Sequence, residues 1–98
     1  MNDYEYTVSV SLRGTSYILG VEYVPEEPDA GIREGYDVFS VNGVELDLPA
    51  CPYSPAAEVE SAEVLRAAGV ADAIPGDLST LAQLAGSAIR AERRRARA

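Results

Sequence analysis

The sequence of 98 residues has no histidine, no tryptophan and no lysine, and only one cysteine and one methionine. The absence of histidine removes the usual general base and the commonest metal ligand, and it excludes zinc sites of the cysteine–histidine type. The single cysteine, Cys51, cannot form an internal disulfide bond, which favours a reducing compartment. We interpret Cys51 as a small apolar residue between Pro49 and Pro52, since a reactive thiol would need a nearby base.

Long apolar runs are also absent. No stretch of the sequence is apolar over the length that a membrane-spanning helix needs. The acidic residues 1–5 lack the apolar region of a secretory signal peptide. We therefore expect a cytoplasmic protein that does not bind a membrane.

The motifs of common catalytic and cofactor sites are missing as well. The glycines do not form a phosphate-binding loop, and the serines have no base that would activate them. Glu26, Glu27 and Asp29 crowd one loop but lack the spacing of a calcium site. The sequence thus predicts a protein that is not an enzyme and that binds no cofactor and no metal.

Charge is distributed unevenly along the chain. The 16 acidic side chains outnumber the 8 basic ones, all of them arginine, and the formal net charge is -8. Because five arginines but only one acid fall within residues 89–98, an acidic body carries a short basic tail. The acid excess either serves solubility or displays a phosphate-like pattern to a nucleic-acid-binding protein. Direct binding to nucleic acid is not expected, because the acidic body repels phosphates and the tail has no aromatic neighbours for base stacking.

The first half of the chain has the pattern of a β-sheet. Strict alternation of apolar and polar residues over 4–13 predicts a half-buried strand. A turn at Gly14 and a second β-rich segment, 17–24, complete an antiparallel hairpin. The prolines and glycines of 25–35 interrupt the sheet.

A second hairpin is predicted after this loop. Residues 36–41 form the third strand, and Asn42-Gly43 is the strongest short signal for a type I′ turn. A fourth alternating strand covers 44–48, so that 3–48 consist of two hairpins. Residues 49–55 are a proline-rich connector.

The segment 56–76 is open to two interpretations. Residues 55–68 have the composition of a helix, with proline at its first position and Gly69 after its last turn. Alternatively, 58–60 begin a strand that completes the sheet.

The last segment is the clearest helix. Asp77 is predicted to cap it, and leucines and alanines three or four residues apart give it an apolar stripe along 77–92. The basic tail is 93–98. Together these elements predict a single α+β domain, in which a small antiparallel sheet of about four strands packs against a C-terminal amphipathic helix, with a second helix at 55–68 as one alternative.

Six tyrosines contrast with a single phenylalanine. The four in the first hairpin are interpreted as core residues whose hydroxyls reach the rim of the sheet; they are Tyr4, Tyr6, Tyr17 and Tyr23. Tyr36 and Tyr53 flank loops and are the better candidates for exposed anchors at an interface.

The order of these parts resembles a group of small proteins encoded by phages and mobile elements. The resemblance rests on Tyr6–Val10, Gly14, Tyr17 and Gly20–Pro25, followed by Glu58–Glu60, Gly69–Asp72 and the helix from Asp77. In those proteins the segment after the prolines is usually a strand. Many of them inhibit host defence, anti-CRISPR proteins among them.

The resemblance implies a stoichiometric inhibitor in the cytoplasm of a bacterial host. It would bind a nucleoprotein effector with a basic, nucleic-acid-binding surface, and would block nucleic acid entry or nuclease recruitment. The acidic contact set implied for this chain, together with the tyrosine anchors Tyr36 and Tyr53, comprises Glu22, Glu26, Glu27, Asp29, Glu34, Asp37, Glu45 and Asp47. Two alternatives remain: an antitoxin, or a structural protein that self-assembles into a homodimer through a sheet edge or through the C-terminal helix.

Overall fold

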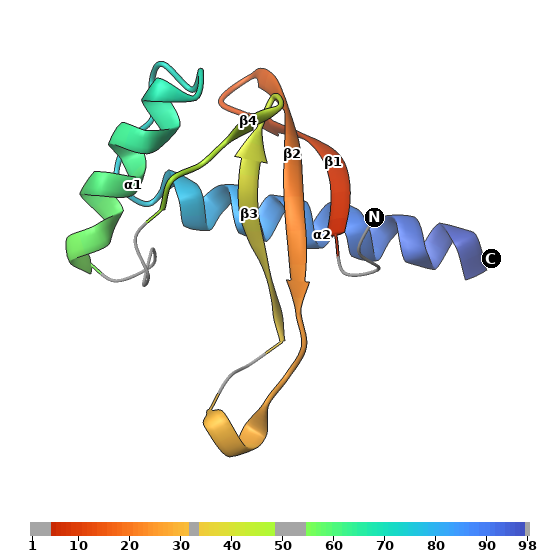
Figure 1. The fold of residues 1–98 in the computed structure, drawn as a ribbon. Helices are drawn as coiled ribbons and strands as arrows, with labels where there is room; N and C mark the ends of the chain where they lie inside the picture. Colours follow the sequence, from red (N-terminus) through yellow and green to blue (C-terminus); the bar gives the residue numbers. More distant parts are fainter. Residues whose placement is uncertain (1–4, 32–33, 49–54, 98) are drawn as a thin grey trace.

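The computed structural model describes residues 5–31, 34–48 and 55–97, with side chains described up to residue 95. The described chain forms a four-stranded antiparallel sheet in the order β1-β2-β3-β4 and two helices, with a short 3-10 turn, η1 (Pro28–Ala30), in the loop after β2. The predicted α+β class is confirmed. The helix α2 crosses one face of the sheet, and α1 packs beside its first turns (Figure 1).

The first hairpin joins β1 (Glu5–Leu12) and β2 (Thr15–Val24). Its two-residue turn holds Arg13 at φ 49° and Gly14 at φ 82°. Two successive positive φ angles are typical of the type I′ turn, whose twist matches that of the strands. The predicted hairpin is therefore confirmed, although β2 begins at Thr15, two residues before the predicted start.

The second hairpin is shorter than predicted. It joins β3 (Gly35–Val41) to β4 (Val44–Glu45) through Asn42-Gly43, and both turn residues have positive φ, as expected for this dipeptide. The prediction that the fourth strand reaches residue 48 is wrong. Beyond β4 the chain leaves the sheet, and its two leucines, Leu46 and Leu48, pack against the edge of the core instead.

A bulge in the sheet explains why one glycine stands within β2. The register between β2 and β3 shifts at Gly20, where Phe39 is the extra residue. A Cβ atom on Gly20 would lie 2.9 Å from the Phe39 ring and would also collide with the hydroxyl of Ser40. The missing side chain thus makes room for Phe39 across the strand.

The ambiguous segment is a helix, α1 (Pro55–Ala67). This confirms the helical interpretation and contradicts the strand at 58–60. The helix ends in a Schellman motif, in which Gly69 adopts φ 114°, its N–H donates to the Arg66 carbonyl and the Val70 N–H donates to the Leu65 carbonyl. Leu65 and Val70 are both fully buried, so burial reinforces this helix end.

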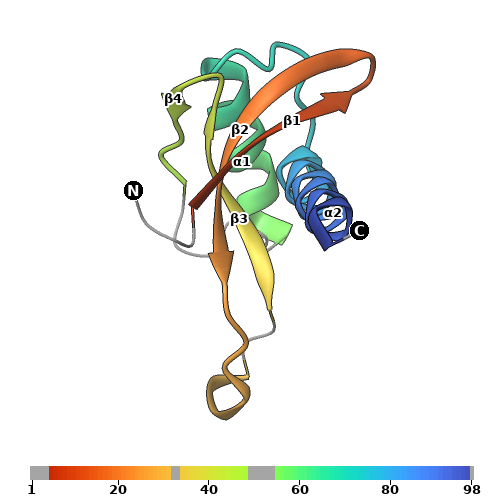
Figure 2. The ribbon, with the colours of Figure 1, turned by 90° about the vertical axis from the view of Figure 1, so that its right-hand side faces the viewer.

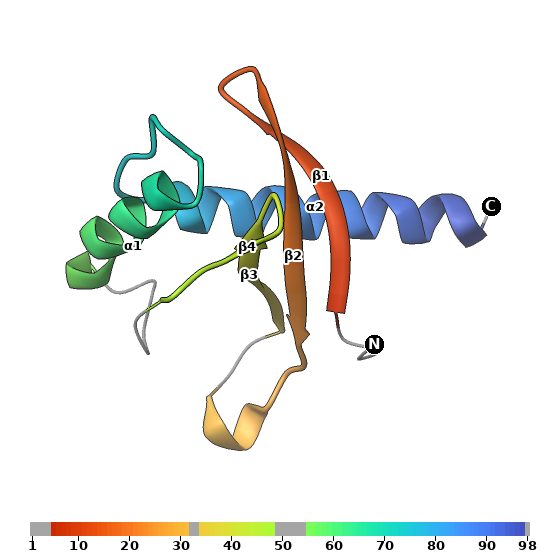
Figure 3. The same cartoon turned by 45° about the horizontal axis from the view of Figure 1, so that its top comes forward.

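The C-terminal helix, α2 (Asp77–Arg97), is longer than predicted. The predicted helix end at residue 92 is wrong, because the helix continues to Arg97. Residues 93–97 are thus part of α2 and not a separate tail. Alanine, arginine and glutamate are good helix formers, and cations at a helix C-terminus interact favourably with its dipole. As a result the basic end of α2 extends past β1 (Figures 1 and 3).

The start of α2 also differs from the prediction. Gly76 occupies the cap position, because its carbonyl accepts the Thr80 N–H at 3.1 Å. Asp77 is the first helical residue, and its carboxylate accepts the N–H of Ile74, which precedes the helix, at 2.9 Å. The expectation that Asp77 caps the helix is therefore wrong.

The core lies between the sheet and α2 (Figure 2). Burial alternates along β1 and β2, so that one face of the sheet is covered and the other is largely exposed. From α2 the core takes four residues of the predicted stripe, all at most 2% exposed: Leu78, Leu81, Ala85 and Ile89. The other two, Leu84 and Ala88, are partly buried. The buried side chains of the stripe therefore pack against the protein's own sheet.

Candidate functional site

Acidic side chains form a row across the sheet face that α2 does not cover. In the strand register, Glu5 of β1 lies opposite Glu22 of β2, which lies opposite Asp37 of β3. All three are exposed. Like charges directly opposite one another destabilise a sheet, and this applies to Glu5 and Glu22. We call these three residues the acidic row.

The loop after β2 extends the negative surface beyond the sheet. It contributes Glu26, Glu27 and Asp29, all exposed, and it protrudes from the end of the sheet at which the acidic row lies (Figure 1). Glu34 follows the loop and lies near the hydroxyl of Tyr23. Burial of that phenol raises the pKa of Tyr23, and the charge of Glu34 raises it further.

The structure brings together only part of the predicted acidic set. Glu22, Glu26, Glu27, Asp29, Glu34 and Asp37 gather at one end of the sheet. Glu45 pairs with Ser40, further along β3. Asp47 lies in the segment that leaves the sheet. Both are exposed, but they are not part of this group.

Glu5 was missed by sequence analysis, although a signal was available. It occupies the polar side of the alternating pattern that predicted β1. What the sequence did not supply is the register that sets Glu5 beside Glu22. Register between strands follows from the turn length, and here the two-residue turn at Arg13-Gly14 fixes it.

The expectation that Tyr36 is an exposed anchor is wrong. Tyr36 is 7% exposed because it lies opposite Tyr23 on the face that α2 covers. The Arg90 guanidinium lies 5.6 Å from the centre of its ring, and a Cβ atom on Gly86 would come within 3.0 Å of it. The predicted anchor Tyr53 lies outside the described residues, as does Cys51.

Two arginines near the end of α2, Arg90 and Arg93, pack against the rings of Tyr36 and Tyr6. Arg93 donates a hydrogen bond of 2.6 Å to the Tyr6 hydroxyl, and its guanidinium lies 5.7 Å from the Tyr6 ring centre. Tyr6 in turn packs edge-to-face on Tyr36, with ring centres 6.4 Å apart. The basic end of α2 therefore serves partly in packing, which leaves Arg94 and Arg95 exposed beyond it.

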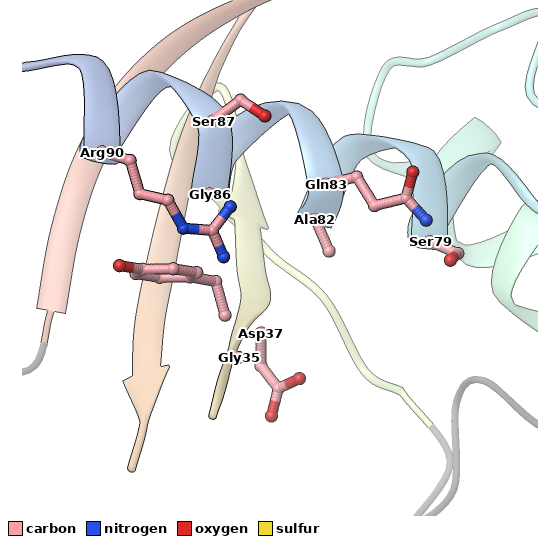
Figure 4. A pocket seen from close by; sticks show the side chains of 9 residues that line it. Gly35, Asp37, Ser79, Ala82, Gln83, Gly86, Ser87 and Arg90 are labelled. Atoms are coloured by element: carbon pink, nitrogen blue, oxygen red, sulfur yellow. The ribbon is translucent and has the colours of Figure 1, made fainter. Parts of the chain in front are cut away.

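A groove of about 480 Å³ lies between the start of β3 and the exposed side of α2 (Figure 4). Gly35, Tyr36 and Asp37 line it from the strand. From the helix the groove is lined by polar side chains, among them Ser79, Gln83 and Arg90, and by the small residues Ala82 and Gly86. Its size is in the range of sites that hold small ligands or short peptide segments.

The described residues form neither a metal site nor a membrane-spanning helix. Across residues 5–31, 34–48 and 55–97, no group of three acidic or cysteine side chains is placed to hold a metal ion. None of the described helices is long and apolar enough to cross a bilayer. No family model matches the sequence, and comparisons with curated proteins and with solved structures gave no significant match.

Proposed function

We propose that this protein is a non-catalytic binding module that acts as a stoichiometric inhibitor of the anti-CRISPR type. Its acidic surface would bind the basic, nucleic-acid-binding surface of a nucleoprotein effector in the bacterial cytoplasm. The bound effector could then no longer admit nucleic acid or recruit a nuclease.

The observation that carries the proposal is the acidic row. Three carboxylates on three adjacent strands, with an acidic loop beyond them, concentrate negative charge on a rigid surface. A basic partner would relieve the repulsion between the paired carboxylates Glu5 and Glu22. Electrostatic complementarity of this kind speeds association and selects the partner.

The alternative of self-assembly through the C-terminal helix loses its best surface. Leu78, Leu81 and Ile89 are buried against the protein's own sheet and are not available to a second copy.

Affinity capture with matched variants tests the proposal. The bait is the full chain in three forms: wild type, a row variant (Glu5→Gln, Glu22→Gln and Asp37→Asn), and a control (Glu60→Gln, Glu63→Gln and Glu92→Gln). The control residues are exposed on α1 and α2, and both variants lose the same charge. Lysate of a bacterium with an active defence nuclease is used at about 0.05 M and about 0.5 M salt, since screening weakens exposed charge pairs over this range.

We expect wild type and control to retain a nucleic-acid-binding complex at low salt only, and the row variant to lose it. The purified complex should then lose its binding of nucleic acid when wild type is added. Recovery of the bait alone, as an oligomer that resists salt, would overturn the proposal. Equal loss with both variants would show that net charge and not the acidic row is responsible.

A further inference from the structure

The outer edge of β3 is open along its first half. β4 and the residue after it pair with β3 only from Phe39 to Val41: Glu45 lies opposite Ser40, and the Leu46 N–H donates to the Phe39 carbonyl. In the part of the chain that the structure describes, no strand lies beside Gly35–Val38.

The strand register indicates which backbone groups point to this edge. A two-residue turn makes Leu12 and Thr15 a hydrogen-bonded pair, and the alternation then directs Glu22 and Val24 toward β3. Their partners Asp37 and Gly35 must therefore point toward β2. The N–H and C=O groups of Tyr36 and Val38 therefore point outward, where they can form hydrogen bonds with another strand.

The helix α2 covers the place where such a strand would lie. It continues beyond the outer edge of β3 toward α1 (Figures 1 and 3). The groove between this overhang and Gly35–Asp37 is the one described above, with Ser79 and Gln83 on its helical wall (Figure 4). An edge strand beside a helix, with a groove between them, is the geometry of peptide recognition by strand addition.

The charged residues at the groove indicate which kind of peptide it would bind. The Arg90 guanidinium lies at one end of the groove, over the Tyr36 ring. The Asp37 carboxylate is turned away from Arg90 (Figure 4), and in the strand register Asp37 lies opposite the exposed Glu22. A carboxylate of a bound peptide would therefore be attracted by Arg90 if it faced α2, and would be repelled by Asp37 if it faced the opposite side of the sheet.

We infer that this groove binds an extended peptide segment of a partner protein as a fifth strand along Tyr36–Val38. An acidic side chain of the peptide faces α2 and pairs with Arg90. The groove shares Asp37 with the acidic row but includes neither Glu5 nor Glu22.

The test uses a short synthetic peptide of alternating threonine and valine with one central glutamate, and the isotope-labelled full chain observed by NMR. Two comparison peptides carry glutamine at the centre, or N-methyl groups that remove the backbone donors. The variants are Arg90→Gln and, as its matched control, Arg94→Gln, which changes an exposed arginine of the same helix outside the groove. A Glu5→Gln/Glu22→Gln variant tests independence from the acidic row.

We expect the glutamate peptide to shift the amide signals of Tyr36, Val38 and Gln83. The glutamine peptide should bind about fivefold more weakly, as for an exposed ion pair, and the N-methylated peptide should not bind. Arg90→Gln should abolish the difference in affinity between the glutamate and glutamine peptides, whereas Arg94→Gln and Glu5→Gln/Glu22→Gln should keep it.

Any of three results with the peptides would overturn the inference. They are no shifts at millimolar peptide, shifts confined to the edge of β1, or a glutamate preference that survives Arg90→Gln. A concentration-dependent dimer that protects the same amides would also overturn it, because a second copy would then be the occupant. The acidic-surface proposal would stand in each case.

Discussion

Arg13 and Asp77, 64 residues apart in the chain, are joined by two hydrogen bonds of 3.0 and 2.7 Å, in which the guanidinium donates to both carboxylate oxygens. Arg13 also donates to the carboxylate of Asp72 at 2.9 Å, and Asp77 accepts the Ile74 N–H. The tip of the first hairpin is thereby fixed to the loop between the helices and to the first turn of α2. This contact orients α2 under the sheet.

Removal of the Asp77 carboxylate should destabilise the fold. Asp77→Ala deprives Arg13 and the Ile74 N–H of their acceptor in a nearly buried site, and we expect the free energy of unfolding to fall by about 1–3 kcal/mol. Urea unfolding followed by circular dichroism measures this change. Asp72→Ala is the control: its side chain is 61% exposed, so the urea midpoint should move much less. Equal shifts would contradict the assigned role of Asp77.

The same contact should make stability depend on pH. Hydrogen bonds from Arg13, and secondarily from the Ile74 N–H, hold the pKa of Asp77 below its usual value. A carboxyl with a lowered folded pKa stabilises the fold above its unfolded pKa of about 3.9, and this contribution is lost as the pH falls through the folded pKa. The difference in unfolding free energy between wild type and Asp77→Asn should therefore shrink from about pH 7 to about pH 3. A difference that stays constant over this range would exclude an ionic contribution.

Two glycines of the sheet should respond oppositely to alanine. Gly20→Ala forces a methyl group against Phe39 and Ser40, and we expect a loss of about 1–3 kcal/mol from overpacking. Gly35→Ala meets open space at a position without positive φ, and should be neutral or slightly stabilising because it restricts the unfolded chain. Thermal unfolding of both variants provides the comparison. A Gly20→Ala variant as stable as Gly35→Ala would contradict the close approach of Phe39.

The apolar stripe of α2 should contribute most of the helix's stabilisation. Leu81 is fully buried, and Leu81→Ala should cost about 2–5 kcal/mol through lost burial and the cavity it leaves. Val59→Ala on α1 is the control, because Val59 is 55% exposed and alanine is a better helix former. If the stripe instead served self-association, Leu81→Ala would dissociate an oligomer in sedimentation experiments. We expect the same monomer mass for both variants.

Local sequence signals predicted most of the secondary structure. The hairpin turns at Gly14 and Asn42-Gly43 are decided by a few residues with special φ angles, and the alternation along β1 is a local pattern. The helical preference of 55–68 and the role of Gly69 are likewise local. The predicted ends of two elements were wrong. The end of β4 depends on the packing of Leu46 and Leu48 against the core, and the last turns of α2 combine good helix formers with the contact of Arg93 with Tyr6.

The candidate site was predictable only in composition. The sequence by itself determined an acidic body, a basic C-terminus and polar residues on one side of the strands. Only the tertiary structure decided that Glu5, Glu22 and Asp37 form one row, that Tyr36 is covered by Arg90, and that a groove lies between β3 and α2. These features depend on strand register and on the path of α2, which result from the summed burial of residues far apart in the chain. Local preferences define each element, whereas the burial of apolar surface and contacts such as Arg13–Asp77 define how the elements meet.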